Sequence, residues 1–345
     1  MFTWCLPRTQ LPDTRKAHYL GMAQTPQTAP VRRALRVKPA TREDKIFFGV
    51  STAAGYSSLV FIILILIFLG VQAWPTFAQQ GVFEFVFGTN WSSNEEQYSI
   101  GPMLWGSVLV AIIGVVLAVP MAISIAYFIQ FMASPKIARA ATIFVDLLAA
   151  IPSVIIGLWG LTVFSQVGAQ WGQMINGALG FIPFFSNEAG SFLGTPFIAG
   201  IVISVMIVPI ISSVTREIFS QIDDDLIKAS ISLGGNREST FRRVILPVSA
   251  SGITGGVLLG LGRALGETVA IFFVLNLIYD DFNWFNILEP AGGAIASLIL
   301  AKFGEASASE VSALLAAGIV LFILTLIINS LAAFIVSRAQ PWNNR

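Results

Sequence analysis

Three ionisable residues interrupt long apolar runs of the sequence and could carry chemistry there: Asp146, Arg263 and Glu267. A charged side chain at the centre of a membrane helix costs roughly 2.5–3.5 kcal/mol, so each needs a structural or functional reason. On a structural interpretation, Arg263 and Glu267 form an ion pair that holds helices together, with Asp146 as a third member. On a functional interpretation, Arg263 faces a central cavity and offers a fixed cation to an anionic solute. The sequence leaves both interpretations open.

A glycine stripe accompanies the charged pair. At about 100° per residue, one helical sector about 80° wide holds five residues, namely Gly252, Gly256, Gly260, Arg263 and Glu267. Glycines at a spacing of four allow another helix to approach closely. We therefore expect a neighbouring helix to pack against the three glycines.

The second stretch that could do chemistry is a charged segment between two apolar runs, residues 221–250, QIDDDLIKASISLGGNRESTFRRVILPVSA. Its acidic residues at 223–225 suit the positive end of a helix dipole. Leu226, Ala229 and Leu233 recur at spacings of three and four, which gives a narrow apolar stripe. Gly234 and the Gly-Asn pair after it tolerate the left-handed conformation that ends helices. The pattern predicts a short helix from Asp223 to Ile231, then a second charged turn that Pro247 closes.

The elements that must position these residues are apolar and helical. The chain has 345 residues, of which 55% are hydrophobic and only 11% charged, far below the quarter that is typical of soluble domains. We predict an all-α polytopic membrane protein, with six runs long enough to span about 30 Å of hydrocarbon. They are Phe47–Ala73, Leu104–Phe131, Ala141–Ser165, Pro196–Val214, Ser251–Leu277 and Ser312–Val336.

The domain organisation follows from these runs. Residues 1–45 are basic, polar and rich in proline, which predicts a disordered cytoplasmic tail. Residues 46–340 form the six-helix membrane domain. Basic residues lie in the tail, in segment 221–250 and at the C-terminus, whereas connections 74–103, 166–195 and 278–311 hold only Lys302. Because basic residues mark cytoplasmic loops, both termini and segment 221–250 are expected in the cytoplasm.

Segment 221–250 resembles the cytoplasmic EAA loop of ABC importer permeases. The resemblance rests on Lys228-Ala229-Ser230, then Gly234 after three residues, and finally Val244, Leu246 and Pro247 at the family's spacings. Lys228 stands where that family has Glu, and Ser230 replaces its second Ala. In that family the loop forms a coupling helix that docks on the ATP-hydrolysing subunit. The resemblance assigns ATPase coupling to seven residues: Asp225, Lys228, Ala229, Ser230, Gly234, Leu246 and Pro247.

A wider resemblance covers about residues 47–337. GLGRALGET at 260–268 and IPSVIIGLWG at 151–160 resemble the PstC-type permease subunits of the phosphate-specific ABC importer, as do GPMLWGS at 101–107 and SLILAKFGEA at 297–306. The resemblance implies the type I importer fold and a bacterial plasma membrane location. It also implies that Arg263 and Glu267 act in phosphate passage.

The resemblance further implies the partners. They are a PstA-like second permease, two ATP-binding subunits and an extracytoplasmic phosphate-binding protein, besides membrane lipid; no nucleic acid is expected. The glycine stripe is expected to meet the second permease. No nucleotide-binding G-x-x-x-x-G-K-[ST] motif is present, so ATP and magnesium would be bound by the partner ATPase. One cysteine and one histidine, both near the N-terminus, favour neither a metal site nor an enzyme. The alternatives are an ABC permease for sulfate or molybdate, and a secondary transporter.

Overall fold

The computed structural model describes residues 41–290 and 292–339, and most of the predicted N-terminal tail lies outside them. The chain divides into two compact units, residues 1–58 and 59–345. The described part of the first unit is the beginning of helix α1 (Arg42–Gln80). Thr41 and Asp44 exchange hydrogen bonds of 2.8 and 3.3 Å at its first turn, a reciprocal cap that starts a helix. Residues 42–45 are therefore helical, and the predicted tail extends too far by these residues.

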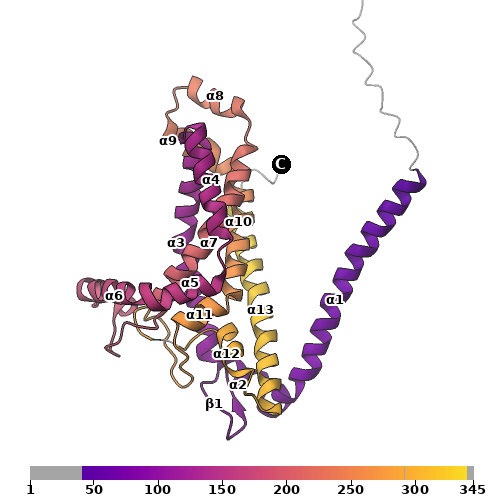
Figure 1. The fold of residues 1–345 in the computed structure, drawn as a ribbon, viewed down its shortest axis with the longest axis vertical. Helices are drawn as coiled ribbons and strands as arrows, with labels where there is room; N and C mark the ends of the chain where they lie inside the picture. The colour runs from indigo at the N-terminus through magenta and orange to yellow at the C-terminus, as the bar shows by residue number, and fades with distance from the viewer. Residues whose placement is uncertain (1–40, 291, 340–345) are drawn as a thin grey trace, which may run out of the picture. The chain divides into compact units, whose positions relative to one another are not determined.

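The second unit consists almost entirely of helices, as the all-α prediction requires (Figure 1). After α1 its α-helices are α2 (Val82–Phe87), α3 (Gly101–Tyr127), α4 (Pro135–Ala149), α5 (Ser153–Trp159), α6 (Ser165–Leu179), α7 (Pro196–Ser220), α8 (Asp224–Ser232), α9 (Arg237–Thr240), α10 (Leu246–Gly266), α11 (Val269–Val274), α12 (Ile295–Lys302) and α13 (Ala308–Ala339). Three π-helical turns continue helices, η1 (Phe128–Met132), η2 (Gly160–Phe164) and η4 (Phe241–Ile245), and η3 (Pro183–Phe185) is a 3₁₀ turn. A small antiparallel hairpin, β1 (Trp91–Ser92) and β2 (Gln97–Tyr98), pairs Trp91 with Tyr98.

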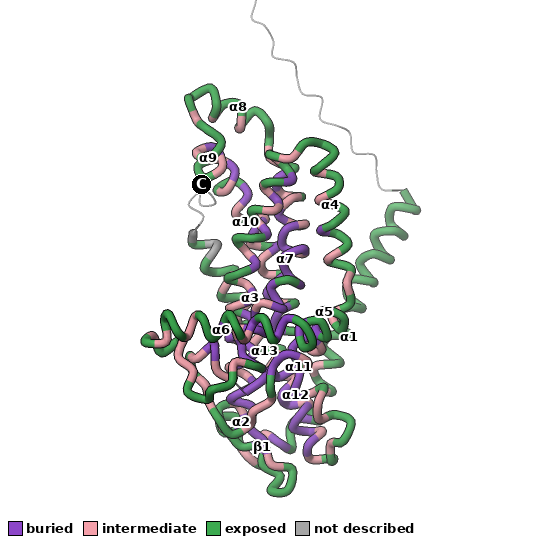
Figure 2. Tube along the Cα trace, turned by 60° about the vertical axis from the view of Figure 1, so that its left-hand side comes forward, coloured by how far each residue is buried: buried purple, intermediate pink, exposed green. Residues whose placement is uncertain are grey.

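Helix α7 is the centre of the core (Figure 2). It is buried along most of its length and packs against both α3 and α10. Small residues allow the close approach to α3: a Cβ atom on Gly114 would lie 2.9 Å from Ile203 Cγ2. Helices α8 and α9 lie at one end of α3, α7 and α10, whereas β1, α2 and α12 lie at the other end (Figure 1).

Six helical segments of the described chain are long and apolar enough to cross a membrane. They are Arg42–Gln80, Gly101–Met132, Ser153–Leu179, Pro196–Ser220, Arg237–Gly266 and Ala308–Ile335. The number agrees with the sequence prediction, but the bounds of the third and fifth segments do not.

The third predicted run, Ala141–Ser165, is not one helix. Helix α4 ends at Ala149 and α5 begins at Ser153, because Pro152 removes a backbone donor and disfavours a helical residue before it. Helix α4 runs alongside α7, whereas α5 and α6 run across them (Figures 1 and 2). The apolar segment thus continues through α6 into residues that we expected in an outer connection.

The fifth predicted run, Ser251–Leu277, is also broken. Helix α10 begins earlier, at Leu246, and ends at Gly266, where Glu267 takes an extended ψ of 122°. A separate short helix, α11, follows. Helices α5 and α11, which come after the two breaks, pack closely: a Cβ atom on Gly157 would lie 2.6 Å from the Cα atom of Ala270. Within connection 278–311, residues Ile295–Lys302 form the short helix α12.

Candidate functional site

The charged segment 221–250 begins with a short helix whose ends agree with the sequence pattern. Asp223 caps α8, since its Oδ1 atom accepts a hydrogen bond of 2.9 Å from the Asp225 backbone. Gly234 ends the helix with φ +85°, and the amides of Gly234 and Gly235 donate to the carbonyls of Ile231 and Ser230, both at 2.9 Å. This paired bonding is a Schellman motif, which requires a left-handed residue where glycine stands.

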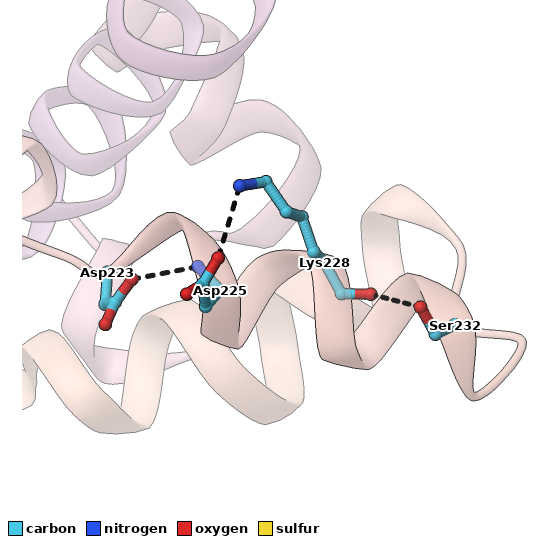
Figure 3. A network of polar contacts seen from close by, with 4 residues as sticks. All are labelled: Asp223, Asp225, Lys228 and Ser232. Carbon is cyan, nitrogen blue, oxygen red and sulfur yellow. Dashed lines mark hydrogen bonds and ion pairs between the residues drawn. The ribbon is translucent and has the colours of Figure 1, made fainter.

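The polar contacts of Asp223, Asp225, Lys228 and Ser232 that Figure 3 shows are made within α8 and its N-cap. Lys228 Nζ lies 3.2 Å from Asp225 Oδ1, and both side chains are largely exposed. The Ser232 hydroxyl donates to the Lys228 carbonyl at 2.9 Å. An exposed pair of this kind contributes little to stability, so both side chains are available to a partner.

The apolar stripe of α8 points away from the rest of the chain. Leu226 and Ala229 are exposed, and Leu233 is 90% exposed. The inward side carries Ile227, which is half-buried, and Ser230, whose hydroxyl lies 2.9 Å from that of Thr240. The stripe predicted from spacing therefore exists and is exposed, by 45% at Leu226 and by 90% at Leu233.

The second half of the segment differs from the prediction. Residues from Arg237 to Gly266 form one helical run, through α9, the π turn η4 and α10. Pro247 is exposed near the start of α10 and does not close the stretch. Because Pro247 lacks an amide donor, the wide turn η4 directly before it accommodates the missing helical bond. Leu246, beside it, is half-buried.

Arg263 and Glu267 do not form the ion pair of the structural interpretation. Arg263 is exposed in the last turn of α10, and no acidic group within residues 41–290 and 292–339 lies within 4.0 Å of it. Glu267 is only 8% exposed, and its Oε1 atom accepts a hydrogen bond of 3.3 Å from the Ala270 backbone at the start of α11. The helix break at Glu267 removes it from the helical face that contains Arg263.

Asp146 is not a third member of that pair either. Its Oδ1 atom lies 3.7 Å from Nη2 of Arg216, which joins α4 to α7. The Arg216 side chain is 21% exposed, and its Nη1 atom is buried without a hydrogen-bond partner in the described chain. This partner of Asp146 was not predicted from the sequence. Arg216 lies only two residues beyond the fourth predicted run, Pro196–Val214. This position could have indicated that a longer fourth helix contains it.

The glycine stripe packs within this chain. A Cβ atom on Gly252 would lie 2.5 Å from Ile218 Cγ1, and one on Gly260 would lie 2.7 Å from Ile211 Cδ1. Gly256 faces Val214 in the same way. All three neighbours belong to α7. The expectation that this stripe meets a second permease subunit is therefore wrong, because a helix of the same chain already occupies it.

No group of three or more His, Cys, Asp or Glu residues in the described ranges is arranged to hold a metal ion. The geometry thus defines a class: a helical protein with six segments able to span a membrane, a capped helix with an exposed apolar stripe at one end, and a cation, Arg263, that has no ion-pair partner among the described residues. A family model described as the inner membrane component of binding-protein-dependent transport systems matches residues 114–341. The chain belongs to this family and is therefore a membrane component of a transport system.

Curated relatives refine the likeness. The chain is 36% identical over 316 residues to the phosphate transport system permease protein PstC 2 of Mycobacterium tuberculosis, a match that covers 90% of this chain and 97% of the relative. It is 36% identical over 299 residues to the phosphate transport system permease protein PstC of Haemophilus influenzae, covering 84% and 92%. These relatives confirm the resemblance to PstC-type permeases.

Solved structures show the same fold. A bacterial alginate ABC transporter in complex with an alginate pentasaccharide-bound periplasmic protein matches with a TM-score of 0.58 and 16% identity, over 87% of this chain and 98% of the other. A bacterial ABC transporter that imports the acidic polysaccharide alginate matches at 0.56 and 18%, over 86% and 96%. The predicted ABC importer permease fold is confirmed.

Proposed function

We propose that this chain is a permease subunit of an ATP-driven importer and forms half of the pathway that carries inorganic phosphate across the bacterial plasma membrane. Membership of the transport family and the phosphate permease names of its relatives support the solute. A secondary transporter does not fit this family. Sulfate and molybdate are oxyanions with chemistry similar to that of phosphate, but the names of the PstC relatives favour phosphate.

The observation that carries the proposal is the exposed apolar stripe of α8. Leu226, Ala229 and Leu233 together form an exposed apolar stripe along a helix with fixed ends, and a contiguous exposed apolar patch is typical of a surface that another protein covers. The ATPase would cover Leu226, Ala229 and Leu233. Asp225 and Lys228 are exposed on the same helix, Ser230 faces Thr240 on the inward side, and Gly234 fixes the direction in which the helix ends. Leu246 and Pro247 begin the membrane helix that follows.

Arg263 is the candidate contact for the solute. Its guanidinium is exposed within an apolar helical segment and has no ion-pair partner in the described chain. A planar guanidinium can bind an oxyanion at two points and keeps its charge at any physiological pH. Glu267 would act indirectly, because its carboxylate holds the start of α11 and so fixes the path of the chain just beyond Arg263.

The importer would also need subunits outside this chain. We infer a PstA-like second permease, two ATP-binding subunits that hold ATP and magnesium, and an extracytoplasmic phosphate-binding protein. The basic residues in segment 221–250 support a cytoplasmic position for α8, where the ATPase would reach it.

Leu233→Asp in the complete transporter tests this function. Burying an Asp against an apolar cleft is unfavourable, so ATPase copurification and phosphate uptake should both fall by about tenfold or more. Leu193→Asp, at an exposed leucine of another loop, is the matched control and should change neither. Uptake is measured in cells that lack other phosphate importers and is normalised to the membrane-inserted chain. Normal ATPase binding and uptake by Leu233→Asp would refute the docking role.

A further inference from the structure

Four aromatic rings from three separate parts of the chain meet beside α8. Tyr127 ends α3, Phe131 lies in η1, Phe219 lies in α7 and Phe241 opens η4. The ring centroids of Tyr127 and Phe241 are 4.5 Å apart, those of Tyr127 and Phe131 5.3 Å, and those of Phe131 and Phe219 5.6 Å. We call these four residues the aromatic bridge.

The aromatic bridge lies between the membrane helices and the underside of α8. Ile227 of α8 and Ile245 of η4 belong to the same apolar cluster as the four rings. Ser230 holds α8 to the next helix through its hydrogen bond of 2.9 Å to Thr240. Movement of α8 therefore reaches the rings through side chains that are already in contact.

Packing at this point is incomplete. A pocket of about 200 Å³, partly open to solvent, lies among Tyr127, Phe131 and Ile227, with Ile231, Arg237, Thr240 and Ile245 completing its lining. Close-packed interiors transmit movement rigidly and resist rearrangement, whereas a cavity leaves room for side chains to shift. The pocket thus leaves room for the side chains beneath α8 to shift.

Two of the π-helical turns lie at this same point. Phe131 lies within η1 and Tyr127 directly precedes it, while Phe241 is the first residue of η4. Single π turns are rare and occur frequently at functional sites. Helix α3 is distant in sequence from α8, so its response to α8 depends on contacts through space rather than on a chain connection.

We propose that Tyr127 and Phe241 are positioning residues that pass movement of α8 to α3 and so couple ATP hydrolysis to opening of the pathway. This inference rests on the proposed function, because it requires that an ATPase moves α8. The two residues touch neither solute nor nucleotide. Removal of either ring should leave the ATPase bound and active. Each ATP hydrolysed should then carry less phosphate.

The experiment uses the complete transporter with its binding protein in membrane vesicles, and measures phosphate uptake and ATP hydrolysis in the same sample. An aromatic pair contributes roughly the free energy of a two- to tenfold change in an equilibrium constant. We expect Tyr127→Ala and Phe241→Ala to lower phosphate carried per ATP hydrolysed by up to about tenfold. Tyr127→Phe keeps the ring and should restore the wild-type ratio.

Phe83→Ala is the matched control, because it removes an exposed ring that contacts Phe87, with a centroid distance of 5.0 Å, outside the aromatic bridge. Unchanged uptake per ATP in both alanine variants would overturn the inference. If the alanine variants do not assemble, phosphate uptake per ATP is measured for Tyr127→Leu and Phe241→Leu instead. If the leucine variants also fail to assemble, the two rings have a structural role and the inference is overturned. Failure of the proposed function is separate: the wild-type complex would then show no ATP-dependent phosphate uptake.

Discussion

At the scale of single residues, Arg263 and Glu267 have opposite surroundings although they are only four positions apart. Arg263 is exposed at the end of α10, whereas Glu267 is buried and accepts a hydrogen bond from the first turn of α11. Because no ion pair joins them, each should act independently: Arg263 on the solute, and Glu267 on the local fold.

A double-mutant cycle tests this independence. Glu267→Ala leaves the Ala270 amide unpaired and should lower the free energy of unfolding by about 1–3 kcal/mol. Arg263→Ala should change stability little, and the double variant should equal the sum within about 0.5 kcal/mol. Phosphate uptake should be lost with Arg263→Ala and strongly reduced with Arg263→Lys, which keeps the charge but lacks the planar fork. Arg243→Lys, at an exposed arginine of η4, is the control and should transport normally.

Thermal unfolding of the purified complex and uptake per assembled transporter are the measurements. Recovery of uptake in the Arg263→Ala, Glu267→Ala double variant would contradict the independence and restore the ion-pair interpretation.

At the scale of elements, the α7–α10 contact depends on glycines that leave room for branched side chains. Gly252 faces Ile218, whose Cγ1 and Cγ2 atoms would lie 2.5 and 2.8 Å from an added Cβ atom. Since β-branched side chains are stiff at χ1, Ile218 cannot easily turn aside. The helices would have to separate, which loosens the centre of the core.

Gly252→Ala should therefore destabilise the protein by about 1–3 kcal/mol, the usual cost of overpacking a core. Gly255→Ala is a control on the same helix, because nothing lies within 4 Å of a Cβ atom at that position. It should be neutral, or more stable by up to about 1 kcal/mol, since alanine favours a helix over glycine. Thermal unfolding of both variants is the measurement. Equal unfolding temperatures for Gly252→Ala and Gly255→Ala would contradict the prediction and show that α7 and α10 tolerate separation.

Local chemistry made some elements predictable from the sequence. The start of α8 at Asp223 and its end at Gly234 depend on caps and on a left-handed turn, which neighbouring residues determine. The breaks before Ser153 and at Glu267 were missed. Pro152 alone does not show whether a membrane helix kinks or ends, and the α5–α11 contact that accompanies both breaks joins residues distant in sequence. The pairing of Asp146 with Arg216 was missed for the same reason.

At the scale of the whole second unit, its two ends differ in chemistry. The end opposite α8 is closed by the β1–β2 hairpin, where Trp91 Nε1 donates to Glu310 Oε1 at 3.0 Å and Ser93 donates to the same oxygen at 3.1 Å. Glu310 is buried in the first turn of α13, where the helix dipole favours a negative charge. This end is neutral to acidic, whereas the end with α8 carries the arginines of η4.

The charge difference predicts which end faces the cytoplasm. With Cys5, the only cysteine, replaced by serine, Glu95→Cys places a thiol at the exposed hairpin and Ser232→Cys places one at the exposed end of α8. A membrane-impermeant maleimide added to intact spheroplasts should label Glu95→Cys and should leave Ser232→Cys unlabelled until the membrane is opened. The reason is that basic residues are retained on the cytoplasmic side during insertion. The reverse pattern would place α8 outside, where no ATPase could reach its apolar stripe, and would contradict both the orientation and the coupling that depends on it.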